Sequence, residues 1–186
     1  MGTQSDNPSR QTTLKQLVRL LVSSLIASAC GAADSRSPDD SPEVLAAAIL
    51  ELITNDHTFG SGPPPFTDYL IQSKLDPFAG EPTGSEESNP RLLTPEEQAA
   101  IESAVGSLGP VQWIDDPDDF RTEDLIPTIE GAAILGVGEP AFSGDEALVP
   151  VSLWCGGLCG TWLTYKVEKV EGRWTVTGIE GPIAVS

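Results

Sequence analysis

The stretch that decides the fold runs from Ala147 to Val170 and reads ALVPVSLWCGGLCGTWLTYKVEKV. Apolar and polar residues alternate in both halves of it, which is the pattern of strands that bury one face. The middle, from Gly156 to Gly160, is rich in glycine and favours a reversal of the chain. The stretch therefore predicts an antiparallel hairpin with two inward rows, Ala147, Val149, Val151 and Leu153 on the first strand and Leu163, Tyr165 and Val167 on the second.

Strand-like sequence continues on both sides of this hairpin. β-branched and aromatic residues alternate with polar ones from Gly131 to Phe142 and again from Arg173 to about Val185. Turn residues separate these segments from the hairpin at residues 143–146 and 171–172. We expect a four-stranded antiparallel meander, with Pro150 at an edge or a bulge because proline cannot donate to a ladder.

The C-terminal region resembles that of a group of uncharacterised bacterial exported proteins and lipoproteins. The shared features are the Cys-Gly-x-x-Cys-Gly turn from Cys155 to Gly160, a following strand that carries Tyr165 and then Glu168-Lys169, and the Gly-x-Trp-x-Val pattern from Gly172 to Val176. The resemblance covers residues 131–186 and implies a cystatin-like or nuclear-transport-factor-2-like α+β scaffold. It carries no activity over to this chain.

Helices are predicted ahead of the meander. Ser41-Pro42-Glu43 favours a helix start with Ser41 as the cap, and residues 44–53 carry one apolar stripe. Thr94 and Glu97 form a capping box for a helix that ends near Gly106. Residues 66–75 predict a short helix between these two, and residues 76–90, rich in Pro, Gly, Ser and Glu, predict a disordered excursion.

These elements predict an α+β fold class, with N-terminal helices packed on a curved antiparallel sheet. The chain has 186 residues, which suits one domain with an appendage. We place that single domain at residues 41–186.

The N-terminus has the features of a targeting segment. Arg10, Lys15 and Arg19 precede an uncharged run over residues 20–29, which is too short to span a bilayer. Ala27-Ser28-Ala29-Cys30 resembles the lipobox of bacterial lipoproteins and also fits an ordinary secretory cleavage site. We expect a signal peptide at residues 1–29 and a flexible tether at 30–40. The protein is then lipid-anchored at Cys30 in the bacterial cell envelope or, alternatively, secreted.

The cysteine count is consistent with lipidation. The chain has three cysteines, so a lipid on Cys30 leaves Cys155 and Cys159 to pair with each other. We interpret that pair as a structural disulfide at the hairpin tip. A redox-active pair and a zinc half-site completed by His57 are the alternatives, although the spacing is not Cys-x-x-Cys and other zinc ligands are few.

The charge of the chain excludes several classes of partner. Lys and Arg number 10 against 28 Asp and Glu, which gives a formal net charge of −18. Nucleic acid would be repelled by this charge, so we expect no nucleic-acid partner. The acids between Asp115 and Asp124 could bind calcium, but their spacing is not that of an EF-hand and a solvated loop is the simpler interpretation.

Four aromatic residues around the hairpin are candidates for a ligand pocket, namely Trp154, Trp162, Trp174 and Tyr165. Aromatic residues of a half-buried sheet also commonly form core, which is the alternative. Asp56-His57 suggests a general base, but the local sequence places no nucleophile beside it.

The sequence thus predicts a non-enzymatic binding or interaction module without a metal or cofactor, whose ligand is a protein or a small molecule. The alternative is a small enzyme with a pocket between the helices and the sheet, in which carboxylates such as Asp68 or Asp116 act as acid or base.

Overall fold

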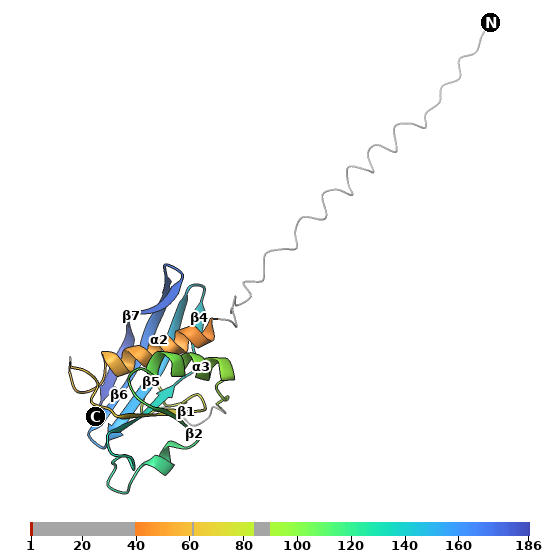
Figure 1. Cartoon of the computed structure of the whole chain (residues 1–186). Coiled ribbons are helices and arrows are strands. Elements are labelled where there is room, and N and C mark those ends of the chain that lie inside the picture. The colour runs from red at the N-terminus through yellow and green to blue at the C-terminus, as the bar shows by residue number, and fades with distance from the viewer. Residues whose placement is uncertain (2–39, 61, 84–89) are drawn as a thin grey trace. The chain divides into compact units, whose positions relative to one another are not determined.

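The computed structural model describes Met1 and residues 40–60, 62–83 and 90–186 (Figure 1). The predicted signal peptide at 1–29, Cys30 and the tether up to residue 39 lie outside the described residues. The elements, in chain order, are α2 (Ser41–Thr54), β1 (Asp68–Gln72), α3 (Pro95–Val105), β2 (Val111–Ile114), the 3₁₀ helix η1 (Pro117–Phe120), β3 (Ala132–Val137), β4 (Ala141–Ser143), β5 (Glu146–Gly156), β6 (Cys159–Val170) and β7 (Arg173–Val185).

The strands form one seven-stranded sheet in the order β2-β1-β3-β5-β6-β7, with β4 beside β5. The strands from β3 to β7 pair antiparallel, whereas β1 is parallel to both β2 and β3. The α+β class and the C-terminal antiparallel strands are therefore confirmed. Pro150 was expected at an edge or a bulge, but it lies inside β5 opposite Thr164, between the segments of β5 that pair with β3 and with β4.

Two details of the predicted architecture are wrong. The short helix expected at residues 66–75 is replaced by β1, so α3 follows a strand and the helices do not all precede the sheet. Tyr69, Leu70 and Ile71 are all buried, because β1 is an interior strand with covered side chains on both faces. A short apolar run of this kind is consistent with a buried strand or a buried helix, and pairing with β2 and β3 decides for the strand.

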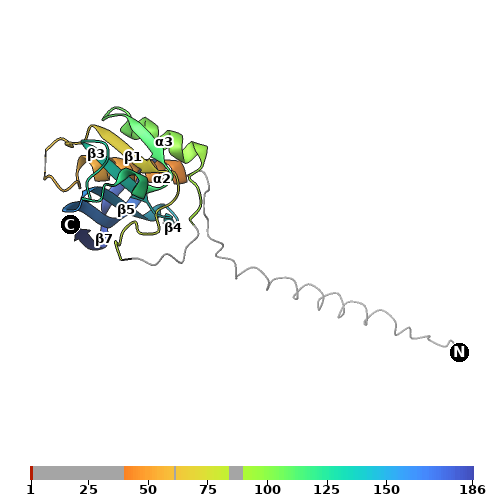
Figure 2. The same cartoon turned by 90° about the horizontal axis from the view of Figure 1, so that it is seen from below.

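Both helices lie on the same face of the sheet (Figures 1 and 2). α2 packs against α3 and against β5, β6 and β7. The space between helices and sheet is filled by the main hydrophobic core, to which α2 contributes Leu45, Ile49 and Leu52, and β6 contributes Leu163 and Val167. The two inward rows predicted for the β5–β6 hairpin are buried in this core and are thus confirmed.

Tyr165 lies at the centre of this core and is fully buried. Its hydroxyl donates a hydrogen bond of 2.6 Å to Asp56 Oδ2, just beyond the end of α2. Burial, together with the hydrogen bond to Asp56 and the charges of Asp56 and Glu51, raises the pKa of Tyr165 above its usual value. Tyr165 therefore stays neutral and ties β6 to the end of α2.

A buried carboxylate, Glu97, joins the two helices. The capping box with Thr94 forms as predicted, and Arg91 binds the same carboxylate through Nη1 at 2.8 Å. Ser41 does not cap α2 as expected; it is the first residue of that helix, and its hydroxyl donates to Glu97 Oε1 at 2.6 Å. Glu97 of α3 is thus held by groups from α2 and from the segment before α3.

These hydrogen bonds determine how Glu97 titrates. Burial raises the pKa, but the hydrogen bonds from Arg91, Ser41 and the Thr94 amide and the charge of Arg91 outweigh it and lower the pKa from 4.5 to about 2. The ionised Glu97 carboxylate therefore stabilises the folded state. Because its pKa is lower in the folded than in the unfolded state, this stabilisation is complete above the unfolded-state pKa and is lost as pH falls toward the folded-state pKa.

We therefore expect Glu97→Gln to lower the free energy of unfolding by about 2 kcal/mol at neutral pH, because it removes charge-assisted hydrogen bonds at a buried site. The difference from wild type should shrink as pH falls from 4.5 toward about 2. Urea unfolding across that range measures it, with Glu96→Gln as the matched control because Glu96 is exposed on the same helical turn. An equal loss of unfolding free energy in Glu97→Gln and Glu96→Gln would contradict the role given to the buried Glu97 carboxylate.

Candidate functional site

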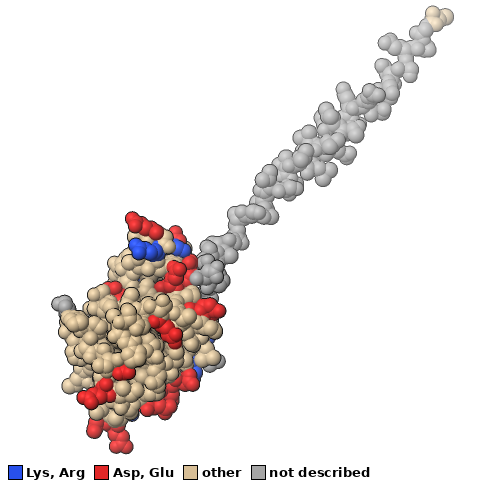
Figure 3. Space-filling view, in the orientation of Figure 1, with Lys and Arg blue, Asp and Glu red and all other residues tan. Residues whose placement is uncertain are grey.

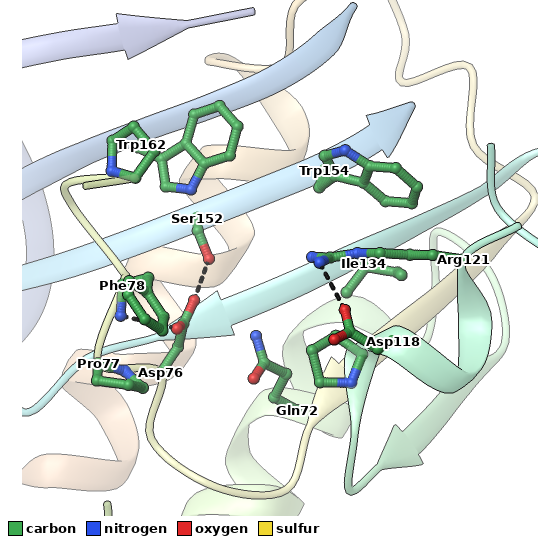
Figure 4. A pocket seen from close by; sticks show the side chains of 12 residues that line it. Gln72, Asp76, Pro77, Phe78, Asp118, Arg121, Ile134, Ser152, Trp154 and Trp162 are labelled. Carbon is green, nitrogen blue, oxygen red and sulfur yellow. Dashed lines mark hydrogen bonds and ion pairs between the residues drawn. The ribbon is translucent and has the colours of Figure 1, made fainter. Parts of the chain in front are cut away.

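A pocket of about 430 Å³ opens on the face of the sheet that the helices do not cover. We call it the open-face pocket (Figure 4). Its lining comes from separate parts of the chain: the end of β1, the segment after it, η1 with Arg121, and strands β3, β5 and β6. The lining residues are Gln72, Asp76, Pro77, Phe78, Pro82, Pro117, Asp118, Arg121, Ile134, Ser152, Trp154 and Trp162.

A buried pair, Asp76 and Ser152, forms one side of the pocket. Ser152 Oγ donates to Asp76 Oδ2 at 2.6 Å, and the Phe78 amide donates to Asp76 Oδ1 at 2.9 Å. The Asp76 amide donates to the Val137 carbonyl at 2.8 Å, and the Gly80 amide donates to the Val151 carbonyl at 3.0 Å. Residues 76–80, within the stretch predicted to be a disordered excursion, are in this way hydrogen-bonded to β3 and β5.

Gly136 makes room for this pair. A Cβ atom at Gly136 would lie closer than van der Waals contact to Asp76 Oδ2 and to Ser152 Oγ. Both of those atoms are held in a buried hydrogen bond, so neither can move aside without breaking it. The absence of a side chain on β3 at this point is therefore a requirement for the site.

Two tryptophans form the opposite side of the pocket, and Figure 4 shows them together across from Asp76 and Gln72. In the register of β5 and β6, Ser152 lies opposite Trp162 and Trp154 lies opposite Gly160. The Trp162 ring lies over Gly160, where a Cβ atom would overlap it. Gly160 thus lets the Trp162 indole lie down along the sheet beside Trp154.

Arg121 brings a positive charge into the pocket. Its guanidinium carbon lies 4.8 Å from the centroid of the Trp154 ring, within the range of a cation–π contact. Its Nη1 donates to Asp118 Oδ1 at 2.9 Å. Among the described residues, the Nε atom of Arg121 is buried and has no hydrogen-bond partner, but the Arg121 side chain as a whole is 34% exposed and lines the pocket together with the Gln72 amide. The pocket therefore presents polar groups that are available to a ligand.

The structure brings together two of the four aromatic residues predicted for a pocket. Trp154 and Trp162 line the open-face pocket, whereas Trp174 and Tyr165 belong to the core on the helix side of the sheet. Alternation along a strand explains the split, because Trp162 and Tyr165 are an odd number of residues apart in β6. Sequence reasoning missed Gln72, Asp76, Phe78, Arg121 and Ser152, none of which stands in a recognisable motif.

Other candidate residues lie outside this pocket. Asp68 accepts a hydrogen bond from Thr67, and Asp116 caps η1 through the Asp118 amide. His57 is buried near the end of α2, where its ring contacts the Gly62 carbonyl and the Phe59 amide. Within the described part of the chain, no group of three or more His, Cys, Asp or Glu side chains is placed to hold a metal ion, the acidic loop at 115–124 included.

The hairpin tip carries the predicted cysteine pair. Cys155 and Cys159 lie at disulfide distance, with Cα atoms 5.1 Å apart. The Gly157 amide donates to the Leu125 carbonyl at 2.8 Å, and Thr58 Oγ1 lies 3.3 Å from Cys159 Sγ. The tip therefore contacts the segment that follows Arg121 and the segment that follows α2.

Comparison of the chain with protein-family models, with curated proteins and with solved structures found no match. The likeness to exported bacterial proteins stays a prediction. Within the described residues, no helix is long and apolar enough to cross a membrane.

We expect Gly136→Ala to destabilise the fold by about 2 kcal/mol, because the new methyl group must displace a buried hydrogen-bonded carboxylate. Gly178→Ala in β7 is the matched control and should change stability by less than about 0.5 kcal/mol, since its Cβ would meet no atom. Thermal and urea unfolding of both variants measures the difference. A neutral Gly136→Ala variant would show that the Asp76–Ser152 pair is not fixed.

Replacing both Cys155 and Cys159 by Ser should lower the free energy of unfolding by only about 2 kcal/mol, because the bridge closes a very short loop. The pairing of β5 with β6 should survive, which amide exchange of residues 146–168 would report. A thiol pKa far below 8.5 together with turnover of a disulfide substrate would instead support a redox role.

Proposed function

We propose that this protein is a non-enzymatic binding module of the bacterial cell envelope that holds a small-molecule ligand in the open-face pocket. The observation that carries the proposal is the convergence of two tryptophans, one phenylalanine and unpaired polar groups on a pocket of about 430 Å³. This volume lies within the range of small-ligand sites, which are concave and combine apolar walls with few polar groups.

The side chains of the pocket favour binding over catalysis. Both oxygens of Asp76 accept hydrogen bonds that hold the segment after β1, so this carboxylate has a structural role. Ser152 donates to Asp76, and the histidine of the chain, His57, does not belong to the pocket lining. A serine activated by a neighbouring base, as in nucleophilic catalysis, is not assembled by these groups.

Residence in the cell envelope is proposed from the N-terminal sequence. The basic segment, the short apolar run and Cys30 support export with lipid attachment at Cys30, and the small polar residues after Cys30 suit a tether. The membrane is then a partner only through the anchor.

A thermal-shift screen tests the binding function. The probes are sugars, amino acids, nucleosides, organic acids and quaternary amines, because a ligand that binds only the folded state raises the melting temperature. We expect at least one class of probe to raise the melting temperature of the wild type but not that of Trp162→Ala. The reason is that loss of a buried aromatic contact typically weakens binding tenfold or more, by about 2 kcal/mol.

Trp113→Ala serves as the matched control for that screen. Trp113 lies in β2, packs against the main core and donates its indole N–H to Glu102, and it does not belong to the lining of the open-face pocket. Its ligand response should equal that of wild type. Stabilisation that is equal in Trp162→Ala, or absent from wild type with every probe, would reject the proposed site.

A further inference from the structure

We propose that the open-face pocket binds a neutral saccharide, with a sugar ring against Trp162 and sugar hydroxyls bonded to Gln72, Arg121 and Asp118. This inference rests on the proposed binding function and names the class of ligand. Three properties of the lining support it: its shape, its hydrogen-bonding groups and its charge.

The lining suits a ligand with apolar faces and a polar rim. Trp154, Trp162 and Phe78 supply flat apolar surfaces, while Gln72 and Arg121 reach the same space from β1 and from the end of η1 (Figure 4). A sugar ring has C–H groups on its faces and hydroxyls around its edge. It can therefore bury its faces on aromatic rings while its edge meets polar partners.

The polar groups of the lining include both donors and acceptors. The exposed part of the Arg121 guanidinium offers N–H donors, and the Gln72 amide offers an N–H₂ group and a carbonyl oxygen. Asp118 accepts from Arg121 with Oδ1, which leaves Oδ2 to accept from a ligand. A hydroxyl both donates and accepts, so a polyol can satisfy all of these groups. A ligand that only donates or only accepts would leave part of the set unpaired, which would weaken its binding.

The charge of the pocket disfavours anionic ligands, and the position of Arg121 disfavours cationic ones. Asp76 and Asp118 outnumber Arg121 in the lining, and the whole chain has a net charge of −18, so an anion would be repelled. The charged side chains on the face of the domain seen in Figure 3 are mostly acidic. A cation would meet Arg121, which already occupies one face of Trp154 at 4.8 Å from the ring centroid.

The polar groups are held in place before a ligand arrives. The segment after Arg121 is fixed by hydrogen bonds from the Thr122 amide to Ile126, from the Thr128 amide to Phe120 and from Gly157 to Leu125. Leu125 adopts a φ of 56°, which a non-glycine residue keeps only where its surroundings enforce it. Such preorganisation reduces the entropy lost on binding, which favours a specific site for a small ligand.

Isothermal titration calorimetry of the purified protein tests the ligand class. The saccharide probes are maltotriose, cellotriose, xylotriose and the trimer of N-acetylglucosamine, each to about 10 mM, a range that detects binding with a Kd of about 1 mM or tighter. Citrate, choline and a tetraproline peptide represent anionic, cationic and peptide ligands. We expect binding of at least one saccharide and of none of the other three.

Variants assign that binding to the pocket. Trp162→Ala and Gln72→Ala should each weaken saccharide binding by about tenfold or more, because one removes the ring platform and the other a hydrogen-bonding group. Trp162→Phe should restore part of the affinity, and Trp113→Ala should bind as wild type does. Circular dichroism of each variant verifies that the fold is intact.

The outcomes separate this inference from the proposed function. Binding of citrate, choline or the peptide that depends on Trp162, with no saccharide bound, would overturn the saccharide assignment and leave the binding function standing. No binding by any probe here or in the thermal-shift screen would overturn both. Saccharide binding unchanged in Trp162→Ala and Gln72→Ala would overturn the assignment of the ligand to this pocket.

Discussion

The β5–β6 hairpin has to serve both faces of the sheet, because successive side chains of a strand point to opposite sides. One set of its side chains, including Leu153, Leu163 and Tyr165, fills the core beneath the helices. The other set, which includes Ser152, Trp154 and Trp162, forms the base and one side of the open-face pocket. Core and site are therefore coupled through register, since a slip of one residue would exchange the two sets.

The second constraint is the burial of a charge at the edge of the site. Asp76 is buried, and it is compatible with the fold because Ser152 and the Phe78 amide hydrogen-bond its carboxylate. Gly136 supplies the space that this arrangement needs. The same interactions place Phe78 and Pro77 on the pocket, so a structural requirement of the segment after β1 also shapes the ligand site.

The sequence was most informative where a local rule decides the structure. The alternation in β5 and β6 and the capping box at Thr94 and Glu97 predicted those elements with nearly correct bounds. β1 could not be predicted in the same way, because a short apolar run such as Tyr69–Ile71 has no period of its own and depends on partners distant in sequence.

The site was predicted only in part for the same reason. Trp154 and Trp162 were visible as aromatic residues of one hairpin, and strict use of alternation would have separated Trp162 from Tyr165. Asp76 and Arg121 come from irregular segments, and only the assembled sheet brings them beside Ser152 and Trp154. No local pattern in the sequence predicts that these residues lie next to one another.

The position of β1 has a consequence for the order in which the chain folds. β5, β6 and β7 are joined by short turns, so they can pair as soon as they are synthesised or released from a denatured state. β1 pairs with β2 across the whole of α3 and with β3 across both α3 and β2, so a long loop must close before any of its contacts form. We therefore expect the late step of folding to be the pairing of β1 with β3, together with the pairing of β2, whose only partner among the described strands is β1. Gln72 and Asp76 reach the site only when that step is complete.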